Sequence, residues 1–137
     1  MAELTTRTAR VWLGEDDGLV HLQPLARREQ TLDDAVENVQ AVKSVCAGVV
    51  RPLLIHFEAA TAQTPECRAH YLSDEATSAV SAVAIVTNSL LGRIVGNLMI
   101  GMHTRGAPVR LFDCTEKASA WLASYLPTVA RVAGARR

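Results

Sequence analysis

The sequence predicts an α/β fold with a mixed sheet of about five strands and about four helices packed against it. Three observations lead to this prediction. Two apolar runs flank an Asp-Gly turn near the N-terminus, three further short apolar runs follow, and segments with helical periodicity lie between and after them. An alternation of strands and helices is typical of crossover connections between parallel strands.

The N-terminal stretch ARVWLGEDDGLVHLQPL is predicted to form an antiparallel hairpin. Its two short runs, rich in Val, Leu and Trp, lie on either side of Asp17-Gly18. This dipeptide readily supplies the positive φ that a hairpin turn needs. The first two strands of the sheet are therefore expected here.

Thr31 and Asp34 have a spacing similar to that of a capping box, so we expect a helix to begin here and to end near Gly48. Residues that recur at intervals of three and four predict which face of this helix is buried. That face is expected to contain Leu32, Val36, Val39, Lys43 and Cys46, with only the lysine interrupting the apolar stripe.

Three short apolar runs predict parallel strands that are buried on both faces. The runs are PLLIHF (52–57), SAVAIVT (81–87) and PVRLFDC (108–114). Helices are expected between and after them, over residues 65–77, 89–103 and 116–126. The parallel strands thus continue the sheet that the hairpin begins.

Composition is typical of a single globular domain, because the chain has 137 residues of which 49% are hydrophobic. We expect an ordered core over about residues 8–127, with loose ends up to about Thr6 and beyond Pro127. Fourteen basic and fourteen acidic residues balance, so no overall field attracts nucleic acid or an anionic membrane. Aromatic residues are sparse, at 4%, and do not alternate with basic ones, which disfavours a platform for single-stranded nucleic acid.

The compartment is predicted to be the cytoplasm. The N-terminus has no apolar signal region, and the longest apolar run, cut by Arg93 and Asn97, is well short of the roughly 18 residues of a membrane span. The three cysteines, Cys46, Cys67 and Cys114, are odd in number and widely spaced, which favours buried reduced thiols over disulfides.

The order of elements resembles the STAS domain, the SpoIIAA-like fold of anti-sigma-factor antagonists and of the cytosolic ends of sulfate transporters. It is also similar to small bacterial proteins described as STAS- or SEC14-like. The resemblance covers about residues 10–126, and it rests on PLLIHFEAATAQTPECRAHY, SAVAIVTNSLLGRIVGNLMIG and PVRLFDCTEKASAWL. It implies one STAS-like domain over residues 1–137.

This sequence departs from the family at the place where antagonists carry a phosphorylated serine in an Asp-Ser-Ser-Gly-like stretch. The corresponding residues are Gln63-Thr64-Pro65-Glu66-Cys67, and proline and glutamate stand where the serines would fall. Thr64 is the only hydroxyl there. It is interpreted as the N-cap of a helix that begins at Pro65, and the alternative is a phosphoacceptor.

Two groups of polar residues are candidates for a ligand or switch region. Glu66, Cys67 and His70 are close together on one predicted helix, and His56 and Glu58 lie at the carboxyl end of a predicted strand, where α/β sheets usually bind ligands. A structural zinc site needs four ligands, and the sequence does not supply a set of four with suitable spacing. A Cys67–His70 nucleophile and base would need a third group to orient the imidazole, and no such residue can be named. No catalytic residue, metal site or cofactor is therefore predicted, and nucleotide-binding glycine motifs are lacking.

The stretch LLGRIVGNLMIG (90–101) contains glycines inside a predicted helix, where each costs about 1 kcal/mol relative to alanine. The apolar arc expected to press on the sheet is Leu90, Leu91, Ile94, Val95, Leu98 and Met102. Beside it lies a flank formed by Ser89, Gly92, Arg93, Gly96, Met99 and Ile100. Either this flank packs against a neighbouring helix of the same chain, or it is an interface between subunits.

We therefore expect a non-enzymatic regulatory or protein-interaction module that self-associates, as a dimer, or binds a bacterial regulatory protein. The alternative is a domain that binds a small or lipid-like ligand in a dry pocket between helix 89–103 and the sheet.

Overall fold

The computed structural model describes residues 3–25, 29–57, 62–90, 92–94, 97, 100 and 106–127. The strands are β1 (Glu3–Thr5), β2 (Ala9–Leu13), β3 (Val20–Pro24), β4 (Arg51–His56), β5 (Val80–Val86) and β6 (Val109–Phe112). The helices are α1 (Leu32–Cys46), α2 (Pro65–Tyr71), α3 (Asp74–Thr77), α5 (Thr115–Leu122) and a 3₁₀ helix (Ala123–Tyr125).

The six strands form one sheet in the order β1-β2-β3-β4-β5-β6. The β1–β2 and β2–β3 pairs are antiparallel, and the β3–β4, β4–β5 and β5–β6 pairs are parallel. The predicted mixed sheet, with a hairpin followed by parallel strands, is confirmed. The predicted loose start is wrong for β1, whose residues are all exposed, so only backbone pairing and no burial pattern marks this strand.

The hairpin turn is longer than a two-residue turn at Asp17-Gly18. Leu13 pairs with Val20, and the amide of Gly14 donates to the carbonyl oxygen of Leu19 at 2.8 Å, so residues 14–19 form the loop. Gly18 has a φ of +71°, in the left-handed region that favours glycine. The Asp17 carboxylate accepts the Leu19 amide at 2.9 Å, which shapes the return into β3.

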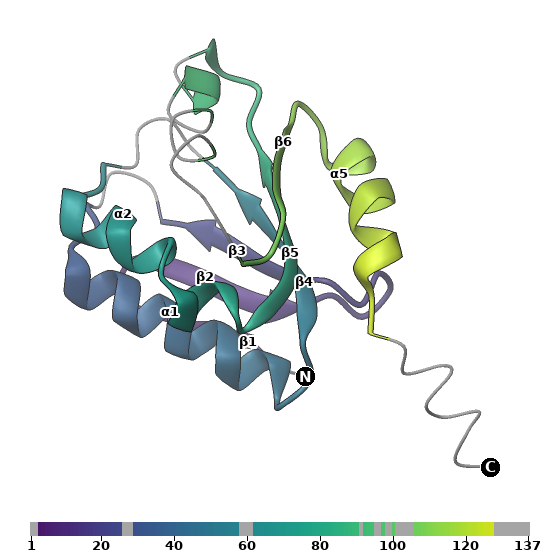
Figure 1. The fold of residues 1–137 in the computed structure, drawn as a ribbon, viewed down its shortest axis with the longest axis horizontal. Helices are drawn as coiled ribbons and strands as arrows, with labels where there is room; N and C mark the ends of the chain where they lie inside the picture. Colours follow the sequence, from purple (N-terminus) through teal and green to yellow (C-terminus); the bar gives the residue numbers. More distant parts are fainter. Residues whose placement is uncertain are drawn as a thin grey trace.

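Helices cover the two faces of the sheet unequally (Figure 1). On one face α1 packs on β2 and β3 and contacts α2, while α3 lies against β5. On the other face α5 contacts β4, β5 and β6. Among the described elements, α5 is the one that covers this second face, so the β2–β3 part of that face has no helix over it.

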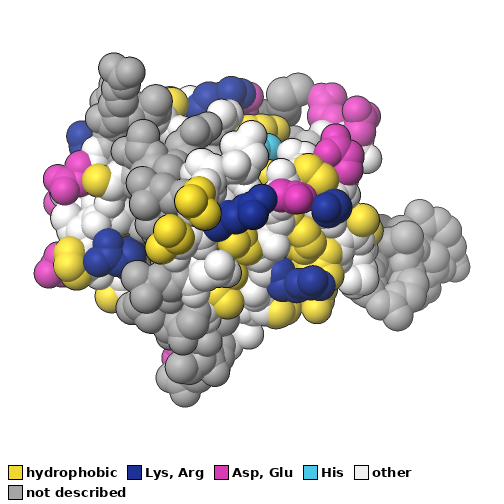
Figure 2. Space-filling view, turned by 90° about the horizontal axis from the view of Figure 1, so that it is seen from above, with side chains coloured by type: hydrophobic (Ala, Val, Ile, Leu, Met, Phe, Trp, Pro, Cys, Tyr) yellow, Lys and Arg dark blue, Asp and Glu magenta, His cyan; other side chains and the backbone are white. Residues whose placement is uncertain are grey.

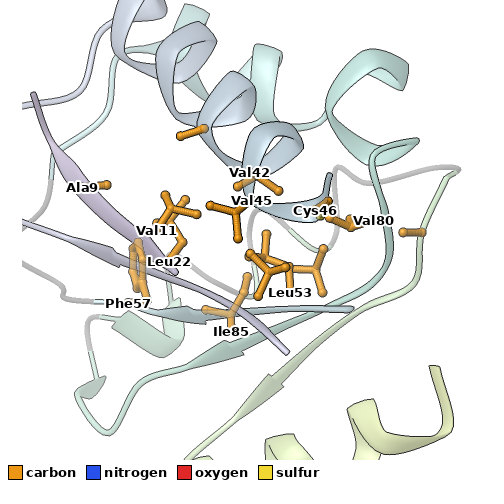
Figure 3. Close-up of a cluster of buried hydrophobic side chains, with 14 residues drawn as sticks. Ala9, Val11, Leu22, Val42, Val45, Cys46, Leu53, Phe57, Val80 and Ile85 are labelled. Carbon is orange, nitrogen blue, oxygen red and sulfur yellow. The ribbon is translucent and has the colours of Figure 1, made fainter. Parts of the chain in front are cut away.

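The larger core lies between α1 and the sheet (Figure 3). Side chains from α1 and from several strands meet there, among them Val11, Leu22, Val42, Leu53 and Ile85. A smaller core lies under α5, where Ala118 and Leu122 pack on Leu54, Ala82 and Ala84. The β4 and β5 strands therefore bury both faces, as their nearly continuous apolar sequences predicted. The same prediction is wrong for β6, an edge strand whose residues are half-buried or exposed.

The capping box at Thr31 and Asp34 and the end of α1 before Gly48 are confirmed. The predicted buried face is wrong for Leu32 and Val36, which are 44% and 39% exposed. The residues that α1 buries are Asp34, Ala35, Asn38, Val39, Ala41, Val42, Val45 and Cys46. The buried face includes two polar residues, Asp34 and Asn38, so the pattern of apolar residues in the sequence did not reveal this face.

The helix predicted over residues 65–77 is two shorter helices, α2 and α3. Thr64 caps α2 by accepting the amide of Cys67 at 3.1 Å, with Pro65 in the first turn as predicted. Ser73 then caps α3 by accepting the amide of Ala76 at 3.2 Å. A second capping side chain inside the apolar pattern therefore begins a new helix.

After β5, residues 90, 92–94, 97 and 100 are helical. The apolar arc predicted to face the sheet is wrong for Leu90 and Ile94, which are 75% and 58% exposed. The arc's other members, Leu91, Val95, Leu98 and Met102, lie outside the described residues. Gly92 is buried instead, so at the start of this helix Gly92 and not Leu90 faces the interior of the molecule.

A buried polar network joins the N-terminal segment to α1 and α2. The Tyr71 hydroxyl donates to Oε1 of Gln30 at 2.8 Å and accepts from Nδ2 of Asn38 at 2.9 Å. Asn38 and Gln30 also donate to Oγ1 of Thr8, at 3.0 and 3.3 Å. Each of these groups thus has a partner in the interior.

Candidate functional site

An open polar pocket lies at the carboxyl ends of the parallel strands. Its volume is about 390 Å³. Strand ends and the start of α5 line it, through Gln23, His56, Phe57, Val86, Thr87, Asn88, Ser89, Asp113, Cys114, Thr115 and Glu116. This is the edge at which open α/β sheets bind ligands, and His56 lies there as predicted. Glu58 lies outside the described residues.

His56 is connected through His21 to Asp17. Nε2 of His56 lies 3.1 Å from Nδ1 of His21, and Nε2 of His21 lies 2.9 Å from Oδ2 of Asp17. Adjacent strands place the two imidazoles, since His21 is on β3 and His56 ends β4. We call Asp17, His21 and His56 the histidine relay.

The indole of Trp12 stacks on both imidazoles of the relay. Its ring centroid lies 5.0 Å from that of His21, with 5° between the planes, and 5.8 Å from that of His56. The guanidinium carbon of Arg10 lies 4.8 Å from the Trp12 ring centroid. The stacked indole restricts the rotation of both imidazoles.

Burial, and then the charge of His21, lower the pKa of His56, and the Asp17 charge opposes them. His56 is therefore neutral at neutral pH. Gly14 closes the other end of the relay, because a Cβ atom there would lie 2.1 Å from Oδ1 of Asp17. The chain thus approaches Asp17 so closely that any side chain at position 14 would displace the carboxylate.

Among the described residues of the predicted switch region, α2 does not bring its polar side chains together. Cys67 is buried while Glu66 is exposed. Burial, and next the nearby Asp34, raise the pKa of the Cys67 thiol to about 11. The thiol donates to Oε1 of Gln30 at 3.9 Å, and Nε2 of His70 is buried with no hydrogen-bond partner within the described part of the chain.

No group of three or more His, Cys, Asp or Glu side chains that could hold a metal ion occurs among the described residues. The three cysteines are free, as predicted; Cys46 and Cys67 are buried, and Cys114 is half-buried in the polar pocket.

The described residues of the predicted interface flank differ in burial. Gly92 is buried, and a Cβ atom there would lie 2.3 Å from Oγ1 of Thr87 and 2.8 Å from Oγ of Ser89. Close packing within the subunit therefore accounts for this glycine. Arg93 is exposed, Ser89 and Ile100 are half-buried, and Gly96 and Met99 lie outside the described residues.

An apolar cavity of about 110 Å³ lies elsewhere than predicted, under α1, α2 and α3. Its walls include Leu22, Val42, Leu53, Ile55 and Val83, and its polar end holds Gln30, Asn38 and Tyr71. The carboxyl-edge pocket is lined mainly by polar groups, whereas this one belongs to the main core.

Asp17, His21 and Trp12 were not predicted as site residues. A two-residue turn at Asp17-Gly18 pairs Trp12 with Gln23, but the observed register pairs Trp12 with His21. Only the longer loop brings the aromatic ring and the imidazole side by side. Gly14 could have indicated the longer loop from the sequence, because glycine is a residue at which a turn can begin.

The space-filling view shows hydrophobic and basic side chains next to one another across the middle of the face (Figure 2). Within the part of the chain that the structure describes, no helix is both long and apolar enough to cross a membrane.

The sheet order and the placement of the helices define a SpoIIAA-like, that is STAS-like, α/β fold. A solved protein of the DUF3478 family from Shewanella loihica PV-4, described as having a SpoIIAA-like fold, is similar to this chain. The similarity covers 87% of this chain and 98% of that one, at 15% identity and a TM-score of 0.59.

The chain belongs to the family described as "Domain of unknown function (DUF7793)", which it matches over residues 11–126. A solved protein of unknown function from Arthrobacter sp. FB24 is 24% identical over 90% of this chain and 99% of that one. Its TM-score is 0.32, too low to compare the folds. No curated protein matches the chain.

Proposed function

We propose that the chain is a non-enzymatic regulatory module of STAS-like type that self-associates through the helical residues after β5. The observation that carries this proposal is the exposure of Leu90 and Ile94. They are four residues apart, so they share one helix face, and they are 75% and 58% exposed. Large apolar side chains that cluster on a surface are typical of interaction sites.

The neighbours of Leu90 and Ile94 also favour an interface. Arg93 is exposed beside them, and arginine is enriched in protein interfaces, unlike lysine and glutamate. A second copy is the simplest partner, because a two-fold axis brings the same patch of each subunit together. Fold-level analogy with anti-sigma-factor antagonists, which act by binding proteins, also supports the proposal, and makes a bacterial regulatory protein the other candidate partner.

The absence of catalysis in this proposal has its own support. The buried Cys67 thiol has a pKa of about 11, so it is protonated at neutral pH and is a poor nucleophile. Thr64 has its hydroxyl oxygen engaged as a helix cap, so a structural role accounts for the one hydroxyl at the position of the family's phosphoacceptor.

Sedimentation velocity of Ile94→Asp beside wild type tests self-association. We expect the wild type to sediment as a dimer and the variant as a folded monomer, because a charge at the centre of an apolar contact is left unpaired. Val50→Asp is the matched control, since Val50 is also exposed, at 51%, but lies between α1 and β4. A monomeric wild type, or equal dimers in all three proteins, would contradict the proposal.

The alternative, a module for an apolar or lipid-like ligand, is favoured by the cavity under α1 to α3. Its volume, about 110 Å³, is below the roughly 150 Å³ of a cavity that admits benzene. A lipid chain does not fit, so this alternative is restricted to a very small apolar molecule. Native mass spectrometry after mild purification separates the two functions: a small adduct supports the ligand module, and a clean dimer supports the interaction module.

A further inference from the structure

The histidine relay determines which ring nitrogen of His56 carries a hydrogen. A carboxylate only accepts hydrogen bonds, so Nε2 of His21, 2.9 Å from Oδ2 of Asp17, carries a hydrogen. In the neutral pair, Nδ1 of His21 is then unprotonated and accepts from Nε2 of His56 at 3.1 Å. Nδ1 of His56 is left without a hydrogen, as an acceptor.

One added proton reverses this arrangement. If it binds His21, that imidazole donates to Nε2 of His56, and His56 must then carry its hydrogen on Nδ1. If it binds His56, both nitrogens of that ring carry hydrogens. In either case Nδ1 of His56 changes from a hydrogen-bond acceptor to a donor. Because Asp17 fixes the hydrogen on Nε2 of His21, the charge of the pair decides whether Nδ1 of His56 accepts or donates a hydrogen bond.

His56 lines the pocket, and Nδ1 is the one polar ring atom that is not engaged with His21. No described residue forms a hydrogen bond with Nδ1 of His56. Hydroxyl and amide side chains of Gln23, Thr87, Asn88 and Ser89 supply further hydrogen-bonding groups around the pocket. The site can therefore hold a small polar molecule by several hydrogen bonds.

The charges around the pocket favour a cation. Asp113 and Glu116 line it, while no described lysine or arginine does. Lys117, 3.2 Å from Asp113, offsets one carboxylate, and the start of α5 adds only about half a positive charge. Among the described residues, the titratable and charged groups at the relay or the pocket are Arg10, Asp17, His21, His56, Asp113, Cys114, Glu116 and Lys117.

We propose that this pocket binds a small primary amine in its ammonium form, which donates a hydrogen bond to Nδ1 of His56, and that protonation of the His21–His56 pair expels it. The protonated pair opposes the ligand in two ways, because it presents a donor to a donor and a positive charge to a positive charge. This proposal does not rest on the self-association proposed above, since neither Leu90 nor Ile94 lines the pocket, although their neighbour Ser89 does.

Ethanolamine is the probe, with ethylene glycol as its neutral analogue and acetate as the anion. Titrations of ¹⁵N-labelled protein are followed by amide shifts at Thr87, Ser89 and Thr115, at about pH 8 and about pH 5, on either side of the range in which histidine titrates. We expect saturable shifts with ethanolamine at the higher pH, their loss at the lower pH, and none with the other two probes.

Asp17→Ala and Asp16→Ala remove the same charge from neighbouring positions, and Asp16 is exposed. We expect the first variant to weaken ethanolamine binding by about tenfold, the size of one lost charged pairing, and the second to leave it unchanged. Since Asp17 also accepts the Leu19 amide, the wild-type imidazole ¹⁵N shifts give a readout that needs no variant: Nδ1 of His56 should be unprotonated at the higher pH.

Several results would overturn the proposal. They are ethanolamine binding that is absent at the higher pH or equal at both, equal binding of ethylene glycol or acetate, equal effects of the two aspartate variants in folded proteins, or a hydrogen on Nδ1 of His56 at the higher pH.

Discussion

The carboxyl group of Asp34 is buried at the start of α1 beside the half-exposed guanidinium of Arg7. Nε and Nη2 of Arg7 donate to its two oxygens at 2.7 and 2.6 Å, and the amide of Thr31 donates to Oδ2 at 2.8 Å. The hydrogen bond from Arg7, more than any other cause, lowers the pKa of Asp34 from 3.8 to about 2. The residue therefore stabilises the fold in its ionised form.

This lowered pKa predicts a loss of stability in acid. The ordinary pKa of the unfolded chain lies above that of the folded chain, so the contribution of Asp34 is complete above about pH 4 and is lost as the pH falls through about 2. We expect about 1–2 kcal/mol, discounted because Arg7 is partly solvated. Urea unfolding of Asp34→Asn against pH should show a smaller acid loss than wild type. Asp33→Asn, at an exposed position, is the control, and equal pH profiles of all three proteins would contradict the assignment.

Thiol reactivity provides a second prediction at this scale. Burial raises the pKa values of both Cys46 and Cys67, while Cys114 is half-buried at the polar pocket. A thiol reagent such as Ellman's reagent should therefore modify Cys114 first in the native protein, and the other two only on unfolding. Cys114→Ser should remove the fast phase. A fast phase that persists in this variant would show that α2 or α1 opens readily.

At the scale of the element, α1 shows how far a periodic pattern can predict a helix. Its start at Thr31 and its end before Gly48 followed from local chemistry, because capping uses residues next to each other in the chain. The local sequence did not predict the rotation of α1 about its axis, that is, which of its faces is buried. Asp34 and Asn38 face inward because Arg7 and Tyr71, from distant segments, hydrogen-bond to them.

The rotation of α1 can be tested with two identical substitutions. Val39 is 6% exposed and Val36 is 39% exposed, so Val39→Ala should leave a cavity in the core while Val36→Ala should not. We expect a loss of about 1–3 kcal/mol in the free energy of unfolding for the first and a change within about 0.5 kcal/mol for the second. Chemical denaturation measures both. Equal losses would mean that the stripe predicted from the sequence is the buried one.

At the scale of the whole molecule, the network around Tyr71 holds together segments that are far apart in the sequence. Tyr71→Phe leaves Gln30 and Asn38 each without one partner in the interior, so we expect a loss of about 1–3 kcal/mol, measured by thermal or urea unfolding. Tyr125→Phe is the matched control, because its hydroxyl makes no hydrogen bond with any described residue. Equal stabilities of the two variants would show that the network is not stabilising.

The sheet and its topology were largely predictable, and the site was not. Each parallel strand could be predicted from a local apolar run. The preference for right-handed crossover connections then restricts the order of the strands. The relay instead depends on a hairpin register shifted by the loop at Gly14, and on His56 from a distant strand. Predicting His56 at the carboxyl edge was possible because strand ends are local features. Finding its partners required the pairing of three strands.

The stacking of Trp12 on the two imidazoles has an optical consequence. A protonated imidazole quenches indole emission far more than a neutral one, and Trp12 lies 5.0 Å from His21 by ring centroids. The other indole, Trp121 of α5, packs with Phe112 and Tyr125. With Trp121 replaced by phenylalanine, the brightness of Trp12 becomes an intrinsic gauge of the charge on the neighbouring pair, readable in dilute solution without a label.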